Sequence, residues 1–266
     1  MKRRSSWIAI VTAAACVGSL AVATATPAEA GNTNKKSKKK GAVDPLHAQS
    51  LMGQGVVFMQ QQRFEEALDR FREADAASPG NATIYNMMGL CHLSLEQFDK
   101  ALEQFDRALI VIPGFTDARN NRGTVYLALG QYRLAEVDFV AVLSDATYPH
   151  RWKVYYNLGV TYLQRGQVGA AEENFRKAIT APIPVFDAYL RLAEIARTQG
   201  RTDSALSLLE EARLKFPDRT EGTLAYGRLL VEVGRANEAR PYLEDVIASN
   251  PSSEMATEAR ALLGHS

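Results

Sequence analysis

The stretch "GLCHLSLEQFDKALEQFDRALIVIP", residues 89–113, sets a spacing that most of the chain repeats. Gly89 is followed after twelve residues by Ala101, after four more by Phe105 and after eight more by Pro113. Small residues let two helices approach closely, and the proline ends the second helix because its ring removes a backbone donor. The spacing therefore predicts a pair of packed helices. The alanine recurs at intervals of 34, 34, 36, 34 and 34 residues, at Ala67, Ala101, Ala135, Ala171, Ala205 and Ala239.

This pattern resembles the tetratricopeptide repeat, a helix–turn–helix unit of 34 residues. One such repeat cannot bury its apolar face alone, so neighbouring repeats stack into a solenoid. We predict an all-α fold, a right-handed α-solenoid of six tetratricopeptide repeats with a C-terminal capping helix. The predicted repeats span residues 48–81, 82–115, 116–149, 152–185, 186–219 and 220–253, and the predicted capping helix spans 254–266.

Residues 1–30 have the pattern of an export signal peptide. Residues 2–4 are basic, an apolar stretch follows, and residues 28–30 place alanines where a signal peptidase prefers small side chains. Two processing routes fit this segment: cleavage before Gly31, which removes Cys16, or lipidation of Cys16, which follows three alanines. Both routes predict an exported, periplasmic protein, and lipidation would anchor it to the outer membrane.

Residues 31–47 are predicted to form a disordered, Lys-rich linker, because they cannot bury apolar surface. Five of the six residues from Lys35 to Lys40 are lysines. Near an anionic membrane surface each lysine would contribute about 1 kcal/mol of attraction, and a solvated spacer is the alternative role.

Charge and motif content exclude several classes of function. Residues 1–40 carry eight Lys or Arg and one acidic residue, which leaves 23 basic and 29 acidic residues, a net charge of −6, for the remainder. This acidic body argues against a nucleic-acid partner, which requires a basic face. The sequence has no phosphate-binding or nucleophile-elbow motif and no Cys/His spacing typical of zinc. We predict a protein that is not an enzyme and uses no cofactor or metal.

The first helices of stacked repeats line a concave surface, on which such arrays usually bind their partners. In the first repeats this surface is predicted to be apolar and Met-containing, with asparagines between. These side chains suit an amphipathic or extended segment of a partner protein. In the last two repeats it is predicted to be charged, with Asp187, Glu194, Arg197, Arg228 and Glu232. The predicted groove residues are Met52, Val56, Met59, Asn86, Leu90, Leu93, Asn120, Asn121, Thr124, Leu127, Lys153, Tyr156, Asn157 and Val160.

The 36-residue interval contains "YPHRWKVYYNLG", residues 148–159, where two extra residues lengthen the connection between repeats. Here the chain resembles the type IV pilus biogenesis pilotin family, and the resemblance covers most of residues 48–215. The residues that carry it are Asn120, Asn121, Gly123, Tyr148, Pro149, Asn157, Leu158 and Gly159. The resemblance implies an envelope protein, lipid-anchored to the outer membrane, that assists assembly of the secretin ring through which the pilus passes.

Three expectations stay open at this point. The extra residues are predicted to change the angle between repeats, with Trp152, Tyr155 and Tyr156 filling the wedge. The protein could instead be a generic periplasmic adaptor for cell-wall or division machinery. It could also be an auxiliary subunit of an envelope enzyme. The identity of the protein bound in the groove distinguishes these two functions from assistance of secretin assembly.

Overall fold

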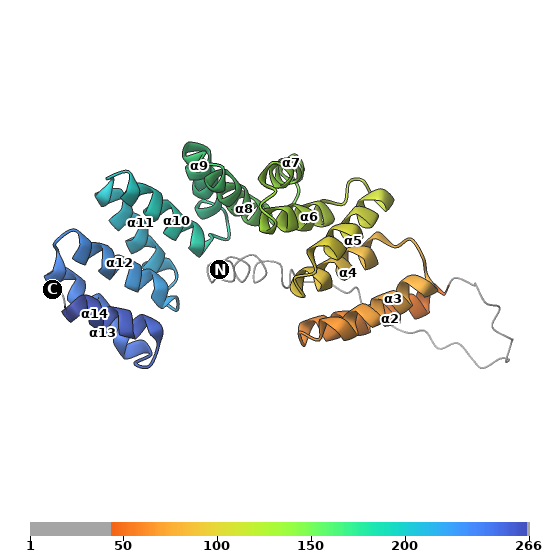
Figure 1. The fold of residues 1–266 in the computed structure, drawn as a ribbon, viewed down its shortest axis with the longest axis horizontal. Helices are drawn as coiled ribbons and strands as arrows, with labels where there is room; N and C mark the ends of the chain where they lie inside the picture. Colours follow the sequence, from red (N-terminus) through yellow and green to blue (C-terminus); the bar gives the residue numbers. More distant parts are fainter. Residues whose placement is uncertain (1–43, 265–266) are drawn as a thin grey trace. The chain divides into compact units, whose positions relative to one another are not determined.

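The computed structural model describes residues 44–264, and every secondary-structure element in that range is an α-helix (Figure 1). The predicted export signal, Cys16 and the Lys35–Lys40 segment lie outside the described residues. The helices are α2 (Pro45–Gln60), α3 (Phe64–Ala77), α4 (Ala82–Ser94), α5 (Phe98–Val111), α6 (Thr116–Ala128), α7 (Tyr132–Leu143), α8 (Arg151–Gln164), α9 (Val168–Ile179), α10 (Phe186–Thr198), α11 (Thr202–Lys215), α12 (Thr220–Glu232), α13 (Ala236–Ser249) and α14 (Glu254–Gly264).

The chain forms two compact units, which divide between Tyr148 and Pro149. The first unit comprises α2 to α7 and the second comprises α8 to α14. Within each unit the helices pack in sequential pairs, such as α2 with α3, and the second helix of a pair packs on the first helix of the next. The prediction of an all-α helical-repeat fold is confirmed. We call α2, α4, α6, α8, α10 and α12 the first helices, and α3, α5, α7, α9, α11 and α13 the second helices.

The repeated glycine sits at a close approach between the two helices of a pair. A Cβ atom added at Gly89 would lie 2.5 Å from Cε1 of Phe105, the aromatic residue that follows the repeated alanine. Gly55, Gly123 and Gly159 meet Phe71, Phe139 and Phe175 in the same way. Each of these rings is fully buried. The predicted close approach of the two helices is confirmed, and it explains why the glycine and the aromatic residue recur together.

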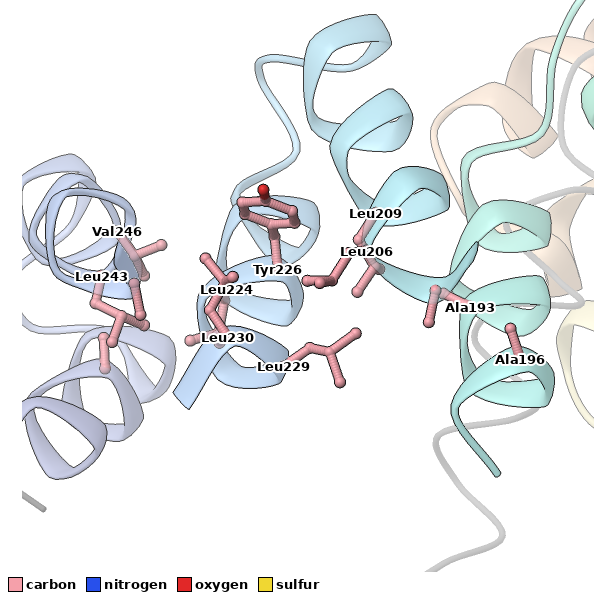
Figure 2. Close-up of a cluster of buried hydrophobic side chains, with 13 residues drawn as sticks. Ala193, Ala196, Leu206, Leu209, Leu224, Tyr226, Leu229, Leu230, Leu243 and Val246 are labelled. Atoms are coloured by element: carbon pink, nitrogen blue, oxygen red, sulfur yellow. The ribbon is translucent and has the colours of Figure 1, made fainter. Parts of the chain in front are cut away.

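The core runs through each unit as a series of clusters between the helices. Figure 2 shows the cluster of the second unit, in which Leu206 of α11, Leu224 and Leu230 of α12, and Leu243 of α13 are buried together. The final helix, α14, adds Ala259 to this cluster, with Met255 and Leu262 packed against it. The capping role predicted for this segment is confirmed, although the described helix ends at Gly264.

The start of the first helix differs from the prediction. Residues 45–47 were expected in the linker, but α2 begins at Pro45 and Asp44 accepts a hydrogen bond from the backbone N–H of His47 at 3.0 Å. An aspartate at the N-cap followed by proline in the first turn is a favourable helix start, because proline has no N–H to leave unsatisfied. The described helices lack the length and apolar character that a membrane span requires.

The two extra residues lie in the connection between α7 and α8. There the side chain of Tyr148 is buried, and its hydroxyl donates a hydrogen bond to Oδ1 of Asp117 at 3.0 Å. Burial, with the Asp117 carboxylate beside it, raises the pKa of the Tyr148 phenol well above its ordinary value. This tyrosine therefore fastens the end of the first unit to α6. The predicted effect of Trp152, Tyr155 and Tyr156 on the angle between repeats stays a prediction.

Candidate partner-binding surfaces

In the first unit the first helices line the inner side, because α4 contacts α6 whereas successive second helices make no comparably extensive contact within residues 44–148. In the second unit α12 contacts the final helix α14. Nδ2 of Asn121 also donates a hydrogen bond to Oδ1 of Asn86 at 3.0 Å, joining α6 to α4. In a stacked array, the helices on the concave side lie closer to one another than those on the convex side. The contacts between α4 and α6 therefore place these first helices on the concave side.

The inner wall of the first unit presents a half-buried apolar surface. Met52, Val56 and Met59 of α2 pack with one side against the core and keep the other side accessible. Leu90 of α4 is also half-buried and packs beside the next cluster. Met87, one turn before Leu90, is half-buried too, and the predicted groove omits it although its helical spacing from Leu90 could have revealed it.

Several predicted groove residues are buried. Leu93 is wrong as a groove residue, because its side chain is 1% exposed and packs in the same core cluster as Phe105. The periodicity of α4 placed it near the inner face, but its side chain turns between α4 and α5. Leu127 and Thr124 are buried in α6, where the Thr124 hydroxyl donates to the backbone oxygen of Asn120 at 3.0 Å.

The asparagines of the wall have different surroundings. Asn86 and Asn121 are buried and bonded to each other, so they tie two first helices together. Asn120 is half-buried, and its buried Oδ1 has no hydrogen-bond partner among the described residues. Buried polar atoms are usually satisfied, and an unpaired amide oxygen can accept a hydrogen bond from a bound chain.

The remaining predicted groove residues lie on α8, in the second unit. Tyr156, Asn157 and Val160 are buried, and the Tyr156 ring packs 5.7 Å from the Phe175 ring. Burial raises the pKa of the Tyr156 phenol. Lys153 is half-buried, with its ammonium group 5.0 Å from the Trp152 ring centroid. A single groove that joins these residues to those of the first unit stays a prediction.

The second unit contains a pocket of about 340 Å³ among α10, α11 and α12. Its floor is apolar, and Figure 2 shows three of its residues, Ala193, Leu209 and Leu229, on these helices. Glu194, Arg197, Arg228 and Glu232 complete its lining with charged side chains. The sequence indicated the four charged residues, but not the pocket, which requires three helices to come together.

The charged groups that line the pocket are paired. The guanidinium of Arg197 contacts Glu194 at 2.7 Å and Glu232 at 2.8 Å, and Arg228 pairs with Glu258 of α14. Hydrogen bonds from Arg197 lower the pKa of Glu194, and the two carboxylates raise the pKa of Arg197. An apolar floor inside a self-paired rim suits an uncharged aliphatic side chain.

The comparisons with known proteins agree with this architecture. Two sequence profiles described as tetratricopeptide repeat match the chain, one at residues 58–120 and 196–263, the other at 120–185 and 156–222. The chain belongs to the tetratricopeptide repeat family. It is thus a protein-interaction scaffold by fold.

Two solved structures of this family are similar over most of the chain. PilF of Pseudomonas aeruginosa has 20% sequence identity and a TM-score of 0.69, covering 81% of this chain and 97% of that one. PilW, described as a widely conserved type IV pilus biogenesis factor, has 22% identity and a TM-score of 0.70, covering 79% and 97%. At these identities the likeness establishes the fold alone.

A curated relative matches a shorter segment. DnaJ homolog subfamily C member 3 is 30% identical over 109 residues in Mus musculus and 32% identical over 110 residues in Homo sapiens. The match covers 41% of this chain and 22% of each relative, so the chain spans about a fifth of their length.

Proposed function

We propose that this protein is an exported scaffold that binds a segment of an outer-membrane secretin and assists its assembly in type IV pilus biogenesis. The observation that carries the proposal is the half-buried apolar face of α2 and α4, with Met52, Val56, Met59 and Leu90. This face lies on the inner side of the first unit. Its function is binding, without a chemical step.

The side chains of this face define the kind of segment that it would hold. Methionines adapt to irregular apolar surfaces, and two of the four side chains are methionines. An amphipathic helix would place its apolar stripe along α2 and α4. The unpaired Oδ1 of Asn120 would accept a hydrogen bond from an N–H of the bound chain.

The assignment to type IV pilus biogenesis has two supports. One is the likeness to PilF and PilW over 97% of each of those chains. The other is the pilotin-like motif residues at positions 120–123 and 148–159. Export through residues 1–30 belongs to the proposal, as does attachment to the outer membrane through Cys16 or the Lys35–Lys40 segment.

Affinity capture from solubilised cell envelopes tests the proposal. The wild-type protein would be compared with Leu90→Glu, which places a charge on the apolar face, and with Leu214→Glu, which places the same charge on an exposed position of α11. Mass spectrometry would identify the bound proteins. We expect secretin to be captured by the wild type and by Leu214→Glu, and to be lost with Leu90→Glu.

The thermal unfolding of the variants separates a binding defect from a folding defect. If Leu90→Glu melts much earlier than the wild type, Leu90 belongs to the core, and Met59→Glu on α2 takes its place in the comparison. Capture of cell-wall or division proteins in place of secretin would favour the generic adaptor. Stoichiometric capture of one envelope enzyme would favour an auxiliary subunit, and either result would overturn the proposal.

A further inference from the structure

The outward face of α7 carries an exposed aliphatic stripe. Leu134, Val137 and Val140 are spaced three residues apart, which places them along one side of the helix. Their side chains are 49%, 64% and 49% exposed. The opposite side of α7 packs into the unit through Ala135, Phe139 and Val142, among others, so the stripe contributes little to the core.

The other second helices show that the fold does not require apolar residues here. The stripe lies one residue before the repeated alanine of α7, Ala135, and two and five residues after it. At these positions the other five helices carry mostly charged or small polar side chains. They are Glu66, Asp69 and Arg72 in α3; Lys100, Glu103 and Asp106 in α5; Ala170, Glu173 and Arg176 in α9; Ser204, Ser207 and Glu210 in α11; and Glu238, Pro241 and Glu244 in α13.

An exposed apolar stripe that the fold does not need indicates a surface that another molecule covers. We propose that α7 mediates self-association, by packing antiparallel on α7 of a second copy across a two-fold axis. The stripe is symmetric about Val137, so this arrangement places Val137 against its own equivalent and Leu134 against Val140 of the other copy. Such an interface is isologous, with one surface used by both copies.

Charge disfavours the equivalent contact on α3, α5, α9 and α13. The same two-fold pairing would oppose like charges at the central position of α3, α5 and α9, where Asp69, Glu103 and Glu173 lie. In α13 it would bring Glu238 against Glu244 of the other copy. Like charges at close range disfavour association. The stripe of α7 carries no charge, so two copies meet there without repulsion.

The size of the stripe sets the strength of the contact. Three aliphatic side chains cover much less than the roughly 800 Å² per partner that stable complexes bury. We therefore expect a weak dimer, with a Kd on the order of 0.1 mM. Copies held close together by one multimeric partner or on one membrane would associate through it, because the effective concentration is then high. The inference is independent of the proposed function, because it concerns a second helix and not the groove.

Sedimentation analysis of the purified protein tests the inference over a concentration range from about 10 µM to about 1 mM, which brackets the expected Kd. We expect the weight-average mass of the wild type to rise with concentration. Val137→Glu should raise the Kd at least tenfold, because it places two carboxylates at the axis. Glu173 occupies the same position in α9, so the substitution is compatible with the fold, and thermal unfolding would check this.

Cysteine cross-linking tests the two-fold geometry. Under mild oxidation Val137→Cys should form disulfide-linked dimers much faster than Ser207→Cys, which places a thiol at the matching position of α11. Cys91 is buried and common to both variants. Equal cross-linking rates together with a concentration-independent mass would overturn the inference. Binding of the monomeric wild type, but not Val137→Glu, to phosphatidylethanolamine–phosphatidylglycerol vesicles would overturn it in favour of a lipid contact.

Discussion

Both units hold an arginine between two carboxylates, but they use it in different places. In the first unit Arg122 of α6 bonds Asp138 of α7 through two hydrogen bonds of 2.8 and 2.7 Å, and Asp106 of α5 at 2.7 Å. The Asp138 side chain is 2% exposed. In the second unit Arg197 bonds Glu194 and Glu232 beside the pocket, where all three side chains are well exposed.

The two arginines therefore lie in different surroundings. In the first unit the arginine and its carboxylates lie between helices. In the second unit they line the pocket. The same ionic motif should therefore contribute to folding in one unit and mainly to surface chemistry in the other, because burial decides how much an ion pair contributes.

The largest expected effect is the loss of Arg122. Arg122→Ala leaves the carboxylate of Asp138 buried without its main partner, so the free energy of unfolding should fall by about 2–4 kcal/mol, less than for a fully buried pair because Arg122 is partly exposed. Arg197→Ala should cost less than about 1 kcal/mol. Urea unfolding followed by circular dichroism measures both.

A paired substitution checks the cause. Arg122→Met together with Asp138→Leu removes both charges, and it should recover most of the stability that Arg122→Ala loses. If Arg122→Ala and Arg197→Ala lower the free energy of unfolding by the same amount, the proposed difference between the two units is wrong.

The second-largest expected change in the free energy of unfolding comes from replacing the repeated glycine. Gly89→Ala would drive a methyl group into the Phe105 ring, at 2.5 Å, and should destabilise the protein by about 1–3 kcal/mol. Gly227→Ala meets the flexible end of Leu243 at 2.8 Å and should cost less. Gly53→Ala on α2 meets nothing within 4 Å and should stabilise by up to about 1 kcal/mol. If Gly89→Ala and Gly53→Ala changed the free energy of unfolding equally, contact with the Phe105 ring would not explain the effect.

The fold was predictable because close helix packing restricts the sequence. A glycine facing an aromatic ring, with alanine one turn before that ring, has few physical alternatives, so its recurrence specified the helix pairs. How deeply each side chain of the inner wall is buried could not be predicted in this way. Helical spacing placed both Leu90 and Leu93 near the inner face, but neighbouring helices decide that Leu90 is half-buried and Leu93 is core.

The pocket of the second unit marks another limit of the sequence. Its floor joins residues of three helices, including Ala193, Leu209 and Leu229, and pairwise spacing along the chain does not show that they converge. By contrast, the start of α2 at Pro45 could have been read from the sequence, since an aspartate followed by proline is a strong start signal, but the predicted linker extended to residue 47.

The turns inside the repeats provide a smaller test. Gly130, Gly166, Gly200 and Gly234 have positive φ angles there, whereas the first two repeats place Gln62 and Glu96 at φ angles of 59° and 56°. Glu96→Gly should relieve this strain and stabilise the protein by about 0.5–1 kcal/mol after the added backbone entropy of the unfolded chain is included. Gly200→Ala should destabilise it. A lower urea midpoint for Glu96→Gly would contradict the expectation.

The smallest expected effect concerns pH and the first unit. His92 is a buried histidine with Nδ1 2.8 Å from Oε1 of Gln97, and residues 149–264 contain no buried histidine. Burial lowers the pKa of His92 below its ordinary value of 6.5; the Gln97 contact and Glu103 oppose this, while Lys100 and Arg72 reinforce it. The unfolded chain therefore takes up this proton at a higher pH than the folded chain.

The stabilisation from neutral His92 is thus fully present above pH 6.5 and declines as the pH falls from there through the folded-state pKa. His92→Gln removes the titrating group, so its free energy of unfolding should fall less than that of the wild type between about pH 8 and about pH 5. Urea unfolding at both pH values measures this. For each protein, the free energy of unfolding at about pH 5 is compared with its own value at about pH 8. Parallel losses in the two proteins would assign the acid sensitivity to carboxylates, which both units carry, and would remove this distinction between the units.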